Sequence, residues 1–330
     1  MIYPWHQQAW QRFQSSADRL PNAWLLVGKR HIGKTEFARH LAASLLCEKN
    51  HGLDACGECS SCHLASLGTH PDFYELTPIV EDEDNAKKLL QIKIEAVRQV
   101  LDNIHLTPLR APRRVVLIHP AESMNIQAAN ALLKALEEPS ETVIFILVAH
   151  HRDRLLPTIK SRCRQFTLPA PNHDEALAYL QQQQVPNAES YLAFHAGSPL
   201  FDHQLDAFEL RHDLLKVLIK PRLLAVLDYA AQFDRAKQPL ALFLDWLDKW
   251  LIDMIATNQG KNVLFYPQYQ DELCGLSDNI PIMKFFALRD EVIQTQPYGQ
   301  HTLNVKLVVE SLLFDYLEIV NKGKNYGGSS

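Results

Sequence analysis

The segment that most constrains the fold is a glycine-rich loop that directly follows an apolar run near the N-terminus. The run AWLLV is followed by GKRHIGKT, which contains Gly28, four further residues, then Gly33, Lys34 and Thr35. In such a loop the backbone N–H groups surround a phosphate, the lysine reaches the β and γ phosphates, and the threonine holds Mg²⁺. The pattern therefore predicts a buried strand, a nucleotide phosphate loop and a helix over residues 35–46.

Short apolar runs alternate with helical segments through the first half of the chain. After an initial helix to about Arg19, further strands are expected at residues 73–76, 115–118, 143–148 and 165–168. Helical periodicity is clearest at residues 89–104 and 127–136. Strands that alternate with helices predict a parallel α/β sheet. After residue 168 the chain has proline-punctuated helical patterns with wide apolar stripes and no convincing strand, which predicts an all-helical second half.

The length and charge of the chain limit what it can be. A chain of 330 residues, 47% of them hydrophobic, is expected to fold throughout into two or three domains. Its net charge of −5 argues against a protein that coats nucleic acid by bulk electrostatics. The N-terminus has no basic segment followed by an apolar run, and the longest apolar stretch, Val143 to Ala149, is too short to cross a bilayer. A cytoplasmic protein is expected.

Four cysteines lie within sixteen residues, in the pattern C-x8-C-x2-C-x2-C: Cys47, Cys56, Cys59 and Cys62. Four thiolates at this spacing can surround one Zn²⁺ ion tetrahedrally and leave no position for water, as in a structural site. A redox pair, an iron–sulfur cluster and a nucleic-acid-binding zinc ribbon are the alternatives. The segment has one lysine, no arginine and no aromatic residue for base stacking, which disfavours the ribbon.

The strand that should carry the hydrolytic acids lacks them. Hydrolysis needs an Asp, usually followed by Glu, to organise Mg²⁺ and the attacking water. Here the strand in RRVVLIHPAE ends in His119 and Pro120, neither of which suits Mg²⁺ or acts as that base. Glu122 follows, but the turn at Pro120 is expected to carry it away from the phosphate loop. We therefore expect no intrinsic ATPase, with an active ATPase that uses Glu122 as base as the alternative.

A longer segment resembles clamp-loader subunits of the AAA+ family. The matching residues are ALLKALEEP at 131–139, the following strand, and SRC at 161–163, together with HPDFYEL at 70–76 and LNVKLVVESLL near the C-terminus. The resemblance covers nearly the whole chain. It implies an AAA+ P-loop α/β domain over residues 1–168 with the zinc module at 47–62, a three-helix lid over 169–207, and a helical collar domain for oligomerisation over 208–330.

The resemblance also implies roles for single residues. Ser161, Arg162 and Cys163 match the arginine-finger motif, in which Arg162 extends into the ATP site of a neighbouring subunit. Two other positions depart from the pattern of the motor subunits. His150 stands at the polar sensor position after the fourth strand, and Leu200 stands where the lid motif has an arginine.

Together these expectations describe a clamp-loader subunit that is itself not a hydrolase. The implied partners are the motor subunits and the clamp-opening δ subunit in a hetero-pentamer, the β sliding clamp, and primed DNA bound without sequence preference through the assembled complex. The loop from Gly28 to Thr35 is intact, so ATP or ADP binding stays open.

Overall fold

The computed structural model describes residues 2–15, 20–49, 54–78, 91–104, 106–201, 207–278, 280–295 and 304–326. These residues form two compact units, one up to Ala176 and one from Leu177 onward. No helix in the described ranges combines the length and the apolar character needed to cross a bilayer.

The first unit is built on a five-stranded parallel sheet with the strand order β2-β3-β4-β1-β5. The strands are β1 (Ala23–Val27), β2 (Phe73–Leu76), β3 (Arg114–Ile118), β4 (Val143–Ala149) and β5 (Arg164–Thr167). Every residue of β1, β3 and β4 is buried, as expected for parallel strands covered on both faces. The predicted parallel α/β sheet is confirmed.

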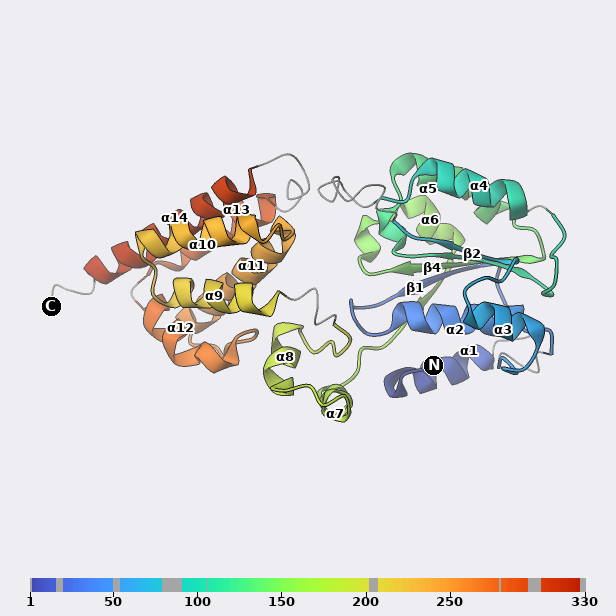
Figure 1. Cartoon of the computed structure of the whole chain (residues 1–330), viewed down its shortest axis with the longest axis horizontal. Helices are drawn as coiled ribbons and strands as arrows, with labels where there is room; N and C mark the ends of the chain where they lie inside the picture. The colour runs from blue at the N-terminus through green and yellow to red at the C-terminus, as the bar shows by residue number, and fades with distance from the viewer. Residues whose placement is uncertain are drawn as a thin grey trace. The chain divides into compact units, whose positions relative to one another are not determined.

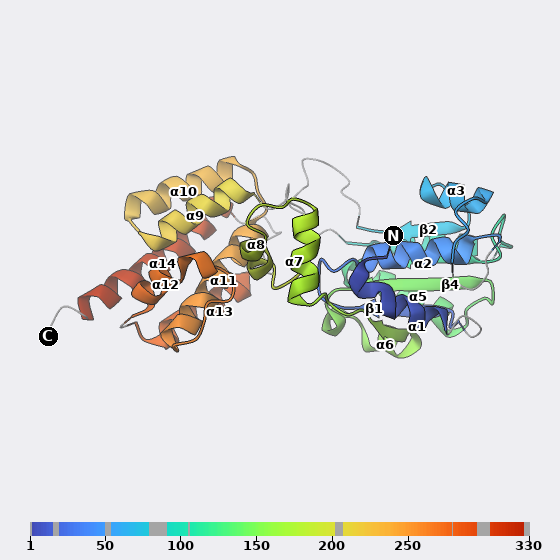
Figure 2. The same ribbon diagram turned by 90° about the horizontal axis from the view of Figure 1, so that it is seen from below.

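Helices cover both faces of this sheet (Figure 1). They are α1 (Gln7–Gln14), α2 (Lys34–Leu46), α3 (Ser60–Ser66), α4 (Ile94–Ile104), α5 (Ile126–Glu137) and α6 (Pro157–Arg162). Side chains of α1 and α2 form one hydrophobic cluster with one face of the strands, and side chains of α4, α5 and α6 form a second cluster with the other face. Figure 1 shows the two sets on opposite sides of the sheet, and Figure 2 views the sheet from the side of α1 and α2, which lie in front of it.

The described residues of the second unit form helices joined by loops and contain no strand, which confirms the predicted all-helical second half. The helices after β5 are α7 (His173–Gln182), α8 (Ala188–Phe194), α9 (Phe208–Ile219), α10 (Leu223–Arg235), α11 (Leu240–Asn258), α12 (Gln270–Ser277), α13 (Ile282–Thr295) and α14 (Val305–Tyr326). One hydrophobic core joins α9 to α14. Its largest fully buried side chains include Trp246, Trp250 and Tyr316.

The finer division of the chain stays a prediction. Between residues 169 and 201 the structure describes two helices, α7 and α8, and α7 runs across the boundary between the two units. Part of the expected lid, residues 202–206, lies outside the described residues. So do Arg19, the expected end of the first helix, and Leu89, the expected start of the helix that begins at Ile94.

Candidate functional site

The glycine-rich loop connects β1 to α2, as predicted. Gly33 directly precedes α2 and has a φ of 91°, a left-handed conformation that glycine adopts at little cost. A Cβ atom on Gly28 would lie 2.9 Å from the carbonyl oxygen of Leu168. The glycines thus allow a tight turn at the carboxyl end of β1, where the free N–H groups of the first turn of α2 can meet an anion. Lys34 and Thr35, which are predicted to contact the phosphates and Mg²⁺, are the first two residues of that helix.

Lys34 brings a buried cation to the loop. Its side chain is 2% exposed, and its Nζ donates a hydrogen bond to the backbone carbonyl of Lys29 within the loop. Burial lowers the pKa of the Lys34 ammonium to about 8, while the negative charge of Glu122 acts in the opposite direction. The group is still mostly protonated at pH 7, so the cation is present where the sequence predicts one.

Glu122 lies beside this loop, so the expectation that the turn at Pro120 carries it away is wrong. Its carboxylate is close enough to Lys34 to raise the pKa of the ammonium. Its Oε1 accepts hydrogen bonds from the backbone N–H groups of His150, at 2.9 Å, and His151, at 3.1 Å. Both histidines follow β4, which is the sheet neighbour of β1. Glu122 therefore links the ends of β3 and β4 next to the phosphate loop.

His150, at the predicted sensor position, is held neutral. Burial lowers the pKa of its imidazole to about 3, and the charges of Lys34 and Arg30 add to this effect. Its Nδ1 is buried and has no hydrogen-bond partner among the described residues. The side chain at this position therefore brings no positive charge to the loop at pH 7.

The residues after β3 are engaged within the protein. The Nε2 of His119 lies 2.6 Å from Oε1 of Glu75, a residue of β2. Arg39 of α2 donates to the same oxygen from Nε at 3.1 Å and from Nη2 at 2.8 Å. The hydrogen bond from His119 is the main cause that lowers the pKa of Glu75, and Arg39 adds to it. Among the described residues, this corner of the sheet holds a hydrogen-bonded cluster around Glu75 and no set of oxygen ligands arranged for Mg²⁺.

Arg162 is the last residue of α6, and its guanidinium is bound within the subunit. Its Nη2 forms an ion pair with Oε1 of Glu137, at the end of α5. Its Nη1 donates to the backbone carbonyl of Thr158 at 3.0 Å and to Oγ of Ser161 at 3.4 Å. Arg162 and Glu137 are 31% and 47% exposed, so water screens the pair and its contribution to stability is about 0–1 kcal/mol. Arg162 can therefore exchange Glu137 for another anion at little cost.

The two neighbours of Arg162 in its motif differ in their surroundings. Ser161 is partly exposed at the C-terminal end of α6, whereas Cys163 is buried in the cluster formed with α4 and α5. Burial raises the pKa of the Cys163 thiol to about 12. Cys163 is therefore an uncharged packing residue behind the exposed arginine. Glu137 was not singled out from the sequence, although it lies within ALLKALEEP.

The four predicted metal ligands are brought together. The Sγ atoms of Cys47, Cys56, Cys59 and Cys62 all lie within 4.8 Å of one another, and none of the four forms a disulfide. The Cys47–Cys59 and Cys56–Cys62 sulfur pairs are each 3.9 Å apart. Four sulfurs at bonds of about 2.3 Å around one zinc ion would lie about 3.8 Å apart, so the cluster fits one tetrahedral metal ion. His63, next to Cys62, is not needed as a ligand.

Hydrogen bonds fasten this cysteine module, residues 47–62, to the rest of the first unit. One set of bonds lies within the module, where the Oε1 of Glu48 accepts from the backbone N–H of Ser61, at 3.1 Å, and from its hydroxyl, at 2.7 Å. Asp54 accepts from Trp10 and Gln14 of α1, at 3.3 Å and 2.7 Å. Glu48 thus closes the module on itself, and Asp54 anchors it on α1.

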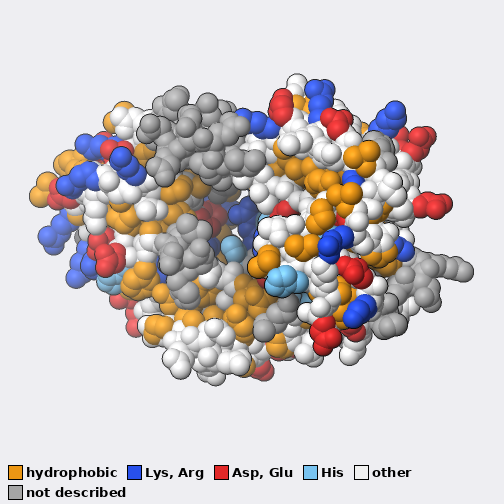
Figure 3. Space-filling model, turned by 45° about the vertical axis from the view of Figure 1, so that its right-hand side comes forward, with side chains coloured by type: hydrophobic (Ala, Val, Ile, Leu, Met, Phe, Trp, Pro, Cys, Tyr) orange, Lys and Arg blue, Asp and Glu red, His pale blue; other side chains and the backbone are white. Residues whose placement is uncertain are grey.

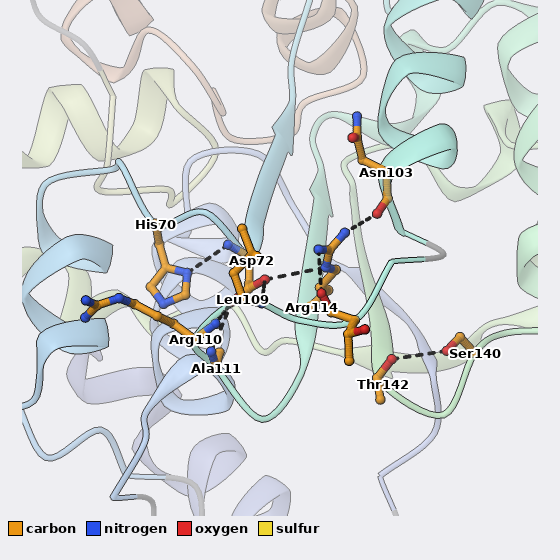
Figure 4. Close-up of polar contacts among 10 residues, drawn as sticks. His70, Asp72, Asn103, Leu109, Arg110, Ala111, Arg114, Ser140 and Thr142 are labelled. Atoms are coloured by element: carbon orange, nitrogen blue, oxygen red, sulfur yellow. Dashed lines mark hydrogen bonds and ion pairs between the residues drawn. The ribbon is translucent and has the colours of Figure 1, made fainter.

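The buried carboxylate of Asp72, which was not singled out from the sequence, holds the loop of residues 106–113 by hydrogen bonds (Figure 4). Asp72 is fully buried and accepts hydrogen bonds from the backbone N–H groups of Leu109, Arg110 and Ala111 at 2.8–3.0 Å. Its Oδ1 also lies 3.4 Å from Nε of the buried Arg114. Arg110 in turn donates to Oγ of Ser60 in α3. The motif HPDFYEL contained this residue, but nothing in it marked the aspartate as buried.

The expected lid motif lies in the second unit. Gly197 has a φ of 82°, and Ser198 is buried. Leu200 lines a pocket together with Tyr179, Leu180, Gln183, Val185, Pro199 and Phe201. Leucine at this position contributes to an apolar surface and has no charge to offer a phosphate.

Among the described residues on the face drawn in Figure 3, Lys and Arg side chains are interspersed with Asp, Glu and hydrophobic ones and do not form one large basic field. This agrees with the net charge of −5.

Comparisons with known proteins extend over the whole chain. A family profile described as DNA polymerase III, delta subunit, matches residues 5–172, and one described as DNA polymerase III, delta subunit, C terminal, matches residues 206–318. DNA polymerase III subunit delta' of Pseudomonas aeruginosa is 34% identical over 98% of this chain and 99% of that protein. The Escherichia coli subunit delta' is 28% identical over 94% of both chains. The subunit gamma of Buchnera aphidicola is 34% identical over 57% of this chain and 51% of that protein.

The first of these relatives is 34% identical over 98% of this chain and 99% of that protein, and the two family profiles match the sheet-containing part and the helical part. The chain therefore belongs to the delta' family of DNA polymerase III subunits.

Proposed function

We propose that this chain is the delta' subunit of a bacterial clamp loader, which helps to place the β sliding clamp on primed DNA. The observation that carries the proposal is the full-length similarity to delta' subunits. Its expected partners are motor subunits of the gamma and tau type and a delta subunit, in a hetero-pentamer. Assembly is expected to occur through the helical second unit, and DNA contact through the backbone phosphates without sequence preference.

The subunit is expected to contribute to ATP hydrolysis only in a neighbour's site. After β3 the side chain of His119 is bound to Glu75, and proline follows, so the acids for a metal-activated water are missing there. An active ATPase remains the second candidate, because Glu122 lies beside Lys34. Steady-state ATP hydrolysis by the isolated chain that is abolished by Lys34→Ala would favour this alternative.

Arg162 is the residue proposed to act in trans. A guanidinium at the end of a short surface helix can reach across a subunit interface, where it would stabilise the charge on a transferred γ-phosphate. Its weak, solvent-screened pair with Glu137 keeps the group ordered in the free subunit and is readily exchanged for a phosphate.

The metal proposed for the cysteine module is zinc, in a structural role. Four sulfur ligands complete a tetrahedral shell and leave no open position for chemistry. The bonds that join Asp54 to α1 and Ser60 to Arg110 suit a module that braces the first unit.

The arginine proposal is tested by Arg162→Ala in a clamp loader reconstituted from all its subunits. We expect the pentamer to form and its clamp- and DNA-stimulated ATPase to fall by up to about twofold and not to zero, because only the site that Arg162 reaches is impaired. Arg154→Ala removes an exposed arginine of the preceding segment and serves as the control. An ATPase rate equal to that of the Arg154→Ala complex would contradict the finger assignment.

A further inference from the structure

The backbone N–H groups that follow β4 are already bound by a carboxylate. Val27 pairs with Ala149 in the sheet, so the next residues, Gly28 and His150, lie at the same level at the start of the phosphate loop. The N–H groups of His150 and His151 both donate to Oε1 of Glu122. Donors that could meet a phosphate at this edge of the sheet are therefore used by an internal anion.

The same carboxylate adds negative charge next to the cation of the loop. Its second oxygen, Oε2 of Glu122, is buried and has no hydrogen-bond partner among the described residues. Lys34 donates a hydrogen bond to the carbonyl of Lys29. The negative charge of Glu122 raises the pKa of the Lys34 ammonium. An ionised carboxylate has no proton to donate, so it repels a phosphate oxygen placed beside it.

This arrangement affects the phosphates of a nucleotide unequally. The loop's N–H groups surround the α and β phosphates, and the lysine reaches on to the γ-phosphate. A third phosphate would extend past the loop toward the end of β4, where it would meet the carboxylate and find the N–H donors occupied. A diphosphate ends before this point.

We propose that Glu122 makes the phosphate loop discriminate against nucleoside triphosphates, so that a nucleoside diphosphate is the form that this loop accepts. The proposed clamp-loader role requires no nucleotide in this loop, so the inference goes beyond that role and does not depend on it. Glu122 is assigned as a specificity-determining residue of the loop.

The test is calorimetric titration of the full chain with ATP and with ADP, each in Mg²⁺ and in EDTA. Glu122→Gln keeps an oxygen that can accept from His150 and His151 but removes the charge. We expect the variant to bind ATP about tenfold or more tightly than the wild type in both buffers, with a smaller change for ADP. Glu36→Gln removes an exposed carboxylate that also acts on Lys34, and it is expected to leave the ATP-to-ADP ratio unchanged.

Three results would overturn the proposal. A Glu122→Gln variant that binds ATP no better than the wild type, including one that binds no nucleotide at all, shows that this carboxylate is not what excludes the triphosphate. If Glu122→Gln increases the affinity for ATP and for ADP equally, the effect is a general one of charge. The same conclusion follows if Glu36→Gln increases the affinity for ATP as much as Glu122→Gln does. A loss of ATP affinity confined to the Mg²⁺ buffer identifies Glu122 as a metal ligand. Circular dichroism of each variant verifies that it is folded.

Discussion

His6 is a buried histidine that the folded protein holds in its neutral form. Its ring packs edge-on against the ring of Phe37 in α2, with 5.7 Å between the ring centroids. Its Nε2 lies 3.2 Å from the carbonyl oxygen of Pro169. Burial lowers the pKa of His6 from 6.5 to about 4, and the charge of Lys34 adds to this effect. Protonation therefore favours the unfolded chain, where the ring is solvated.

This predicts acid sensitivity of the first unit in a defined range. The contribution of His6 is fully present above about pH 6.5 and is lost as the pH falls from 6.5 to about 4, because the unfolded state binds more protons there. The loss is at most about 1.4 kcal/mol per pH unit, or roughly 3 kcal/mol in all. Urea unfolding followed by tryptophan fluorescence between pH 4.5 and 7.5 measures this slope.

His6→Gln is the matched variant, since its amide can still donate to the carbonyl of Pro169. We expect a flatter dependence of the unfolding free energy on pH in the variant, with the two slopes differing most between pH 6.5 and about 4. Identical slopes in the two proteins would rule out a neutral, buried His6 as the source.

At the residue scale, the sequence identifies groups that belong to one continuous motif. Gly33, Lys34 and the four cysteines are separated by short spacings, and their placement is as predicted. The partners of His119 and Arg162 were not predictable in this way. Glu75 and Glu137 reach them only because strands and helices distant in the sequence pack side by side, and a single sequence contains no signal for such pairings.

At the scale of elements, burial explains which boundaries were predictable. Strands such as β4 are continuous apolar runs, and the predicted and observed bounds differ there by one residue. β3 begins one residue earlier than predicted, because Arg114 is a charged residue that pairs with Asp72 in the interior. The start of α5 at Ile126 follows from Asn125, whose side chain accepts from the N–H of Ala128 at 2.7 Å.

The cysteine module predicts what removal of its metal does. Without a metal ion no bond joins the four sulfurs, and α3 has only seven residues, too few to form an independent helix. Because binding free energy in such a site is folding free energy, chelation should destabilise the module by several kcal/mol. Hydrogen–deuterium exchange read by mass spectrometry should become faster over residues 54–66, with the metal content measured in parallel.

Cys59→Ser should reproduce this effect without a chelator. Cys274→Ser alters an exposed cysteine of α12 and is the control, for which we expect unchanged metal content and exchange. If residues 54–66 exchange at the wild-type rate after verified metal loss, the module is held by its other contacts and the metal is not structural.

At the scale of the whole molecule, the two units have separate hydrophobic cores. The core of the second unit includes a buried polar chain in which Nε1 of Trp250 donates to the hydroxyl of Tyr316 at 3.0 Å. That hydroxyl donates to the carbonyl of Leu218 at 2.9 Å. These bonds join α11, α14 and α9, and none of the three residues belongs to the clusters on either face of the sheet. The two units should therefore lose structure separately.

Trp250→Ala tests whether the two units unfold separately and whether the second unit carries the assembly with the partner subunits. Removing a fully buried tryptophan costs about 3–5 kcal/mol, and it also leaves the Tyr316 hydroxyl without its donor. We expect faster exchange throughout α9 to α14, loss of association with the motor and delta subunits, and unchanged exchange in β1, β3 and β4 with full metal content. Trp250→Phe, which keeps most of the ring volume, should retain assembly at a smaller loss of stability. If the strands exchange as fast as the helices in Trp250→Ala, the two units are one cooperative structure. If assembly survives the loss of the helical core, the partners bind elsewhere on the chain.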